Sequence, residues 1–170
     1  MYCFVRVALR HFTRERSRTT SVGGSRKLIK LASASLPGAI NLIGALAERE
    51  LRLGICTNKQ EGIARAILEK AKLLPMFGAI IGGDSGFGLK PSPAPLYAAL
   101  QRLKATSSRT VFVGDSAIDD EAAVAVQVPF ARVRHPGYPT PITPFEPEYQ
   151  LGELSELTAI VDRRNKVAAP

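Results

Sequence analysis

The 170-residue sequence has few of the residues on which disulfide-stabilised and aromatic-rich proteins rely. It contains two cysteines, two histidines and no tryptophan, and aromatic residues make up 6% of it. Two cysteines do not make a disulfide framework, and Cys56 lies in an apolar run where a free thiol would be buried. We therefore expect a reducing, cytoplasmic compartment.

Long hydrophobic runs are also absent. Charges and prolines interrupt every apolar stretch well before the roughly 20 residues that a bilayer requires, so no membrane span is predicted. The N-terminus lacks an apolar stretch followed by a small-residue cleavage site, which argues against a secretory signal. Its Arg- and Ser-rich composition resembles a transit peptide only weakly, and a solvated tail is the favoured interpretation.

The net charge of +8 is distributed unevenly. Residues 1–30 carry +7 and residues 162–170 carry +2, which leaves the intervening body close to neutral. The positive charge is therefore a property of the ends of the chain and says little about what the body binds. The basic N-terminal segment has no stacking aromatic residue beyond Phe12 and no recognition motif, so no specific nucleic-acid partner is expected.

What the sequence does contain is a regular alternation of strand and helix patterns. With 45% hydrophobic residues, 170 residues suffice for one compact domain. A helix opening at Pro37 has its apolar face at Ile40, Ile43, Leu46 and Ala47. Further helices are predicted at 61–73, 93–103, 119–126 and 153–161, and strands at 51–56, 79–81, 110–113 and 130–133. Such alternation predicts an α/β fold of Rossmann-like type, a parallel sheet with helices on both faces.

Polar residues follow three of the predicted strands. They are Thr57-Asn58-Lys59, then Gly82-Gly83-Asp84 with Lys90-Pro91 downstream, and Gly114-Asp115-Ser116 with Asp119. Each group alone is typical of a helix cap, a turn or a solvated side chain. Because ligands of parallel sheets bind at the carboxyl ends of the strands, the groups together place a hydroxyl, an ammonium and two carboxylates along one edge. These groups can hold a phosphoryl group and a hard divalent cation.

The three groups resemble motifs of the haloacid dehalogenase superfamily, and within it those of the phosphoglycolate phosphatases. The second motif of that superfamily is similar to Leu53–Lys59, the third to Lys90–Leu96 and the fourth to Val111–Asp119. The Gly82-Gly83-Asp84 sequence also resembles the phosphoglycolate phosphatase pattern. The resemblance covers roughly residues 36–161, and three motifs recur in order at similar intervals.

The resemblance implies a Mg²⁺-dependent phosphomonoester hydrolase acting on a small phosphorylated metabolite, 2-phosphoglycolate. By the same resemblance, Thr57 and Lys90 would be the catalytic residues of this chain. Thr57 would hydrogen-bond the phosphoryl oxygens, with Asn58 beside it in the substrate site, and Lys90 would neutralise their charge. Asp115 would bind Mg²⁺, and Asp119 would support the metal site.

One part of the superfamily pattern has no counterpart in this sequence. The first motif, Asp-x-Asp-x-Thr, supplies the nucleophile at the end of a central strand, yet the first aspartate here is Asp84. The helical cap that follows this motif is missing too, so we expect an N-terminally incomplete core. Residues 2–9 either replace the central strand, with Val5 or Val7 at the nucleophile position, or are unrelated sequence that docks loosely or not at all.

These observations predict three segments and leave several functions open. Residues 1–35 form a basic, partly disordered segment with a possible strand at 2–9, residues 36–161 the core, and residues 162–170 a flexible tail. The leading expectation is a phosphoglycolate-phosphatase-like core, catalytically impaired because the nucleophile is absent. The alternatives are a non-catalytic remnant that retains a phosphate or Mg²⁺ site, and a binder of anionic surfaces through the basic arm. Oligomeric state is left open.

Overall fold

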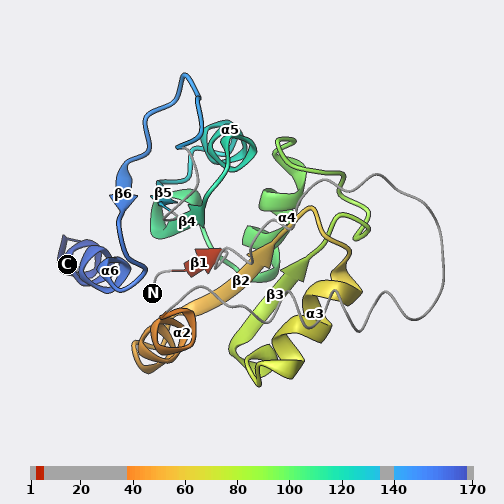
Figure 1. Ribbon diagram of the computed structural model, residues 1–170, viewed down its shortest axis with the longest axis horizontal. Helices are drawn as coiled ribbons and strands as arrows, with labels where there is room; N and C mark the ends of the chain where they lie inside the picture. Colours follow the sequence, from red (N-terminus) through yellow and green to blue (C-terminus); the bar gives the residue numbers. More distant parts are fainter. Residues whose placement is uncertain (1–2, 6–37, 135–139, 168–170) are drawn as a thin grey trace.

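A computed structural model describes residues 3–5, 38–134 and 140–167, in which strands and helices alternate along the chain (Figure 1). The strands are β1 (Cys3–Val5), β2 (Arg52–Cys56), β3 (Phe77–Ile81), β4 (Thr110–Gly114), β5 (Phe130–Val133) and β6 (Tyr149–Leu151). The helices are α2 (Ala39–Glu48), α3 (Glu61–Lys70), α4 (Ala94–Arg102), α5 (Ala117–Ala125) and α6 (Glu156–Val167). The predicted α/β class is confirmed.

The sheet has the order β3-β2-β1-β4-β5-β6, and every neighbouring pair is parallel. Strand β1 lies in the middle, with Phe4 paired to Leu53 of β2 on one side and to Val111 of β4 on the other. Of the two alternatives for residues 2–9, the structure therefore has a central strand over Cys3–Val5. The rest of that segment, Val7 included, and the basic arm through residue 37 lie outside the described residues.

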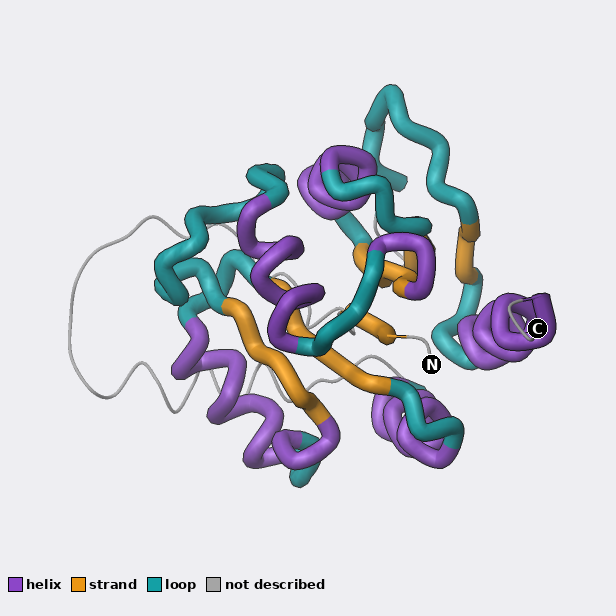
Figure 2. The backbone as a smooth tube through the Cα atoms, turned by 180° about the vertical axis from the view of Figure 1, so that it is seen from behind, coloured by secondary structure: helices purple, strands orange, loops and turns teal. Residues whose placement is uncertain are grey.

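Helices cover both faces of the sheet (Figures 1 and 2). On one face, β4 and β5 side chains such as Val111 and Val133 pack with α2 and α6, while Ile55 packs with α3. On the other face, Phe112 and Phe130 pack with α4 and α5. Because both faces are covered, strands such as β4 are buried along their full length, which explains their continuous apolar sequence.

The buried face of α2 differs from the predicted one. The structure buries Ala39, Leu42, Ile43 and Leu46, whereas Ile40, which was expected in the core, is 53% exposed. Both stripes are apolar at helical spacing, so periodicity alone does not choose between them. Packing against the sheet does: Ile43 and Leu46 belong to both faces, and Ala39 and Leu42 are buried in place of Ile40 and Ala47.

The C-terminal region is more ordered than predicted. The expected flexible tail at 162–170 is helical as far as Val167, because α6 buries Leu157, Ile160 and Val161 and continues beyond them. Asp162 in this extension accepts a hydrogen bond of 2.8 Å from Arg49 Nε. Strand β6 was not predicted, since it is only three residues long and follows a proline-rich segment. Within the described ranges no helix is long and apolar enough to cross a membrane.

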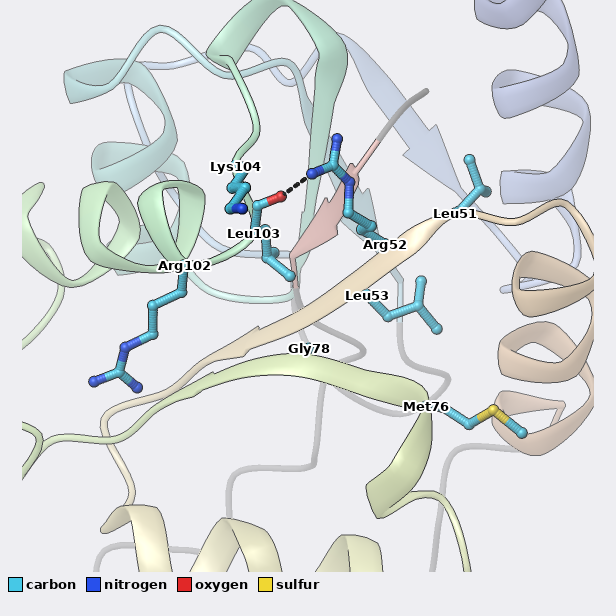
Figure 3. A pocket seen from close by; sticks show the side chains of 8 residues that line it. All are labelled: Leu51, Arg52, Leu53, Met76, Gly78, Arg102, Leu103 and Lys104. Carbon is cyan, nitrogen blue, oxygen red and sulfur yellow. Dashed lines mark hydrogen bonds between the residues drawn. The ribbon is translucent and has the colours of Figure 1, made fainter.

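A cavity of about 330 Å³ opens where β2 and β3 begin (Figure 3). It is lined by Leu51, Arg52, Leu53, Met76, Gly78, Arg102, Leu103 and Lys104. Arg52 Nη1 donates a 2.5 Å hydrogen bond to the carbonyl of Leu103, just beyond α4, so this arginine satisfies the end of the helix. The cavity therefore lies at the edge of the sheet opposite the predicted site residues, which follow the carboxyl ends of the strands.

Candidate functional site

The loops that follow β2 and β3 are joined by backbone hydrogen bonds. The amide of Thr57 donates to the carbonyl of Ile81 at 2.9 Å, and the amide of Gly83 donates to the carbonyl of Lys59 at 2.7 Å. A Cβ atom at Gly83 would lie 2.6 Å from the carbonyl oxygen of Asn58, so this close approach requires glycine. The two loops thus form one surface at the carboxyl edge, and Thr57 is buried within it.

Asn58 connects these loops through its side chain. Its Oδ1 accepts a hydrogen bond from the amide of Lys90 at 2.8 Å, and its Nδ2 donates to the carbonyl of the same residue at 2.9 Å. The main chain of Lys90 is therefore held on both sides by one amide group. Asn58 was predicted to contact substrate; the contacts described for its side chain are with Lys90.

Lys90 brings its ammonium group into the interior at the end of β2. The Nζ atom donates to the carbonyl of Cys56 at 2.9 Å and to Asp119 Oδ1 at 2.6 Å. It also lies 5.4 Å from the centre of the Phe112 ring, within the range of a cation–π contact. The side chains of the ion pair are 1% and 0% exposed, so this is a fully buried charge pair.

Asp119 reaches back from α5 to the end of β4. Its Oδ2 accepts a 2.5 Å hydrogen bond from Ser116 Oγ and a longer one, 3.4 Å, from the amide of Asp115. An added Cβ at Gly114 would lie 2.7 to 2.8 Å from the Asp119 side chain, so glycine at the end of the strand makes room for the carboxylate. Asp115 and Asp119 are therefore neighbours at the same edge as Lys90.

The Gly82-Gly83-Asp84 sequence has a structural role in the described contacts. Asp84 Oδ1 accepts a 2.7 Å hydrogen bond from the amide of Glu61, the first residue of α3, and so caps that helix from a distant loop. Ser85 Oγ donates to Glu61 Oε2 at 2.5 Å. This hydrogen bond is the largest cause of the lowered pKa of Glu61, to which Arg65 also contributes.

A second buried ion pair lies beside the site, and sequence reasoning missed it. Arg132 Nη2 on β5 donates to Asp120 Oδ2 on α5 and, at 3.1 Å, to the carbonyl of Phe145. Burial raises the pKa of Asp120, and the hydrogen bond from Arg132 opposes that shift. The available signal was an arginine inside the otherwise apolar strand Phe130–Val133, directly after which the proline-rich segment begins.

The structure thus brings all five predicted site residues to one edge of the sheet. Thr57 and Asn58 follow β2, Lys90 comes from the loop after β3, and Asp115 and Asp119 follow β4. The described part of the chain contains no cluster of three or more side chains suited to a metal. Two neighbouring carboxylates nonetheless suit Mg²⁺, which in proteins is commonly held by one or two carboxylates together with water and phosphate oxygens.

The model of the haloacid dehalogenase-like hydrolases matches residues 10–133. This chain belongs to that family.

Phosphoglycolate phosphatases are among its similar relatives. The enzyme of Rhodospirillum rubrum is 44% identical over 126 residues, which are 74% of this chain and 50% of that protein. The enzyme of Agrobacterium fabrum is 32% identical over 126 residues, covering 74% of this chain and 54% of that protein. The 170-residue chain therefore spans about half the length of these two relatives.

Solved structures of the family share the fold. A phosphatase from Thermococcus onnurineus superposes with a TM-score of 0.67 at 26% identity, covering 75% of this chain and 58% of that one. The Bacillus subtilis hydrolase YfnB, whose crystal structure is bound to magnesium, superposes with a TM-score of 0.69 at 21% identity, covering 81% and 61% of the two chains. At 21% identity, the similarity to YfnB shows a shared fold.

Proposed function

We propose that this haloacid dehalogenase-like chain is a phosphoglycolate-phosphatase-like core that holds a phosphoryl group and Mg²⁺ at the carboxyl edge of its sheet. The observation that carries the proposal is the buried network of Lys90, Cys56 and Asp119, with Asp115 adjacent. Similarity to phosphoglycolate phosphatases supports 2-phosphoglycolate as the substrate to test first.

Thr57 and Lys90 are assigned to the phosphoryl group. A hydroxyl and an ammonium in a fixed, water-poor setting stabilise charge on phosphoryl oxygens without having to reorganise. The Lys90 ammonium already has its place set by Cys56 and Asp119, so its positive charge is positioned in advance. Asn58 holds the main chain of Lys90 and borders the same substrate site.

Asp115 and Asp119 are assigned to the metal. Asp119 accepts hydrogen bonds from Lys90 and Ser116, so it supports the site, whereas Asp115 is the more direct ligand. Bound there, Mg²⁺ would supply positive charge to the phosphoryl oxygens. Its affinity is expected to be modest, because the described residues provide two carboxylates.

Turnover needs one more group, an in-line nucleophile. No aspartate precedes Asp84 in the 170 residues, so the family's aspartyl nucleophile has no counterpart ahead of the second motif. Asp115 and Asp119 are poor substitutes because moving either would vacate the metal site. Without a covalent nucleophile, what is left is the residual acceleration from binding and electrostatics. The proposal for the 170-residue chain is therefore binding with impaired hydrolysis.

Calorimetry tests the binding part. We expect the purified chain to bind Mg²⁺, and 2-phosphoglycolate in its presence, and expect Asp115→Asn to lower both affinities at least tenfold. The matched control is Asp162→Asn, which neutralises a carboxylate on α6, far from the site in the chain and on the other face of the sheet. Equal affinities in the parent and Asp115→Asn would contradict the assignment.

Hydrolysis of 2-phosphoglycolate tests the rest. The parent chain is expected to release no more phosphate with Mg²⁺ than the Asp115→Asn variant does. Robust Mg²⁺-dependent turnover that Asp115→Asn abolishes would show that another residue or another chain supplies the nucleophile. Absence of both binding and turnover would favour a fold retained without a phosphate site.

A further inference from the structure

The first turn of α5 lies between two buried ion pairs. Asp119 and Asp120 are consecutive, yet their carboxylates point to different partners. Asp119 pairs with Lys90 from the loop after β3, and Asp120 pairs with Arg132 of β5. The Arg132 and Asp120 side chains are 6% and 1% exposed, which is as little as most of the apolar core.

Arg132 is connected to the metal and phosphoryl site by the pairing of β5 with β4. It is the register partner of Gly114, the glycine against which the Asp119 side chain packs. In parallel strands, paired residues project to the same face, here the face covered by α5. Arg132 therefore links the end of β5 to the helix that carries Asp119, and through the carbonyl of Phe145 to the segment before β6.

We propose that Arg132, acting through Asp120, is a positioning residue that fixes the first turn of α5 so that Asp119 stays against Lys90 and Asp115. This inference deepens the proposed function, because it concerns the same metal and phosphoryl site. A buried ion pair is weak evidence for stability, since an apolar pair of similar size often packs as well. We assign the Arg132–Asp120 pair a role in geometry. Arg132 holds Asp120 from β5, and Lys90 holds Asp119 from the end of β2.

The test variant removes the pair without leaving an isolated charge. Asp120→Leu combined with Arg132→Met replaces both partners by apolar side chains of similar size, which protects the fold. The matched control is Arg49→Met combined with Asp162→Leu, which removes an ion pair between the end of α2 and α6. Urea unfolding of all three proteins establishes that each has a cooperative transition.

The first measurement needs neither metal nor activity. Acetic anhydride labels lysines, and peptide mass spectrometry follows Lys90 against exposed lysines such as Lys104 in the same sample. The parent is expected to label slowly at Lys90, because its ammonium is buried against Asp119. The Asp120/Arg132 double variant is expected to label several-fold faster there, and the Arg49/Asp162 control at the parent's rate.

The second measurement is the affinity for Mg²⁺ alone, by calorimetry. Loss of a partner outside the metal ligands typically lowers metal affinity 10- to 100-fold, and about tenfold is expected for the Asp120/Arg132 double variant, with no change in the control. If the parent binds no Mg²⁺, the proposed function fails, and Lys90 labelling alone decides the positioning role.

The inference is overturned if Lys90 labels in the Asp120/Arg132 double variant at the parent's rate, or no faster than in a control of equal stability. If that double variant lacks a cooperative transition, Arg132→Lys replaces it. This variant keeps the positive charge but loses the planar, forked guanidinium. Faster labelling of Lys90 in folded Arg132→Lys supports the role, and an unchanged rate overturns it.

Discussion

Lys90 Nζ and Asp119 Oδ1 lie 2.6 Å apart in the interior, and the pair joins segments that are 29 residues apart in the sequence. The lysine comes from the loop after β3, and the aspartate from the first turn of α5. The ammonium also donates to the carbonyl of Cys56, and the carboxylate also accepts from Ser116. Each charge thus has a second polar partner, as a buried ion pair requires.

Removing one partner of this pair should be costly. Lys90→Met leaves the Asp119 carboxylate buried without its cation and is expected to lower the free energy of unfolding by about 3 to 5 kcal/mol. Adding Asp119→Asn removes the isolated charge and should recover part of this loss in urea unfolding. The exposed pair of Arg65 and Glu61 serves as control, because Arg65→Met should cost less than about 1 kcal/mol. Equal losses in the Lys90 single and double variants would contradict this view.

A side chain at Gly114 should destabilise the fold. Gly114→Ala places a Cβ 2.7 to 2.8 Å from Asp119 and is expected to destabilise the fold by about 1 to 3 kcal/mol. Gly62 in α3 is the matched control, since an added Cβ there meets nothing within 4 Å. Gly62→Ala should stabilise by about 0.5 to 1 kcal/mol, because alanine favours the helix. Thermal or urea unfolding measures both, and a neutral Gly114→Ala would show that Asp119 moves freely.

Ser85→Ala should destabilise the protein more at neutral than at acidic pH. The Ser85 hydrogen bond is the main cause of the lowered pKa of Glu61. Ionised Glu61 therefore stabilises the fold at pH values above its ordinary value of 4.5, and this contribution disappears as the pH falls through the lowered pKa. The pH-dependent part is expected to be about 1 kcal/mol or less, because the Glu61 side chain is 26% exposed.

Urea unfolding at pH 7 and pH 3 measures that difference. The variant also loses the hydrogen bond that Ser85 Oγ accepts from the amide of Gly82, and this loss is the same at both pH values. Ser155→Ala removes an exposed bond to Glu153 and provides the control. A Ser85→Ala effect that grows at pH 3 would contradict the assignment.

Asn58→Ala should remove both bonds that hold the main chain of Lys90. At about 1 kcal/mol for each net hydrogen bond, the expected loss is about 2 kcal/mol in the free energy of unfolding. Asn41 is an exposed asparagine in α2, and Asn41→Ala is expected to be neutral or slightly stabilising. If Asn58→Ala behaves like Asn41→Ala, the bonds contribute little to holding the loop.

Much of this architecture was predictable because the strands and the motifs follow strong local rules. A strand buried on both faces reads as a continuous apolar run, so β2, β4 and β5 were predicted close to their observed bounds. The five candidate residues share one edge because they follow parallel strands, whose carboxyl ends lie together. Neither inference needs knowledge of side-chain packing.

The features that the sequence did not predict depend on packing between segments that are distant in the chain. Arg132 pairs with Asp120 only because β5 lies beside β4 in the sheet, a relationship absent from the local sequence. Likewise Asp84 caps α3, which begins 23 residues earlier, and an Asp after two glycines is equally typical of a turn. Such long-range partners become visible only in the folded chain.

The central position of β1 sets a length scale for chemistry at this edge. Neighbouring strands are about 4.8 Å apart, so one intervening strand separates β2 from β4 by roughly 9 to 10 Å. Thr57 follows β2 and Asp115 follows β4, so their main chains are separated by two strand spacings, and the Lys90 ammonium, which donates to Cys56 and Asp119, spans part of that distance. Three residues, Cys3–Val5, thus act as a spacer: without a strand between them, β2 and β4 would pair directly and halve that gap.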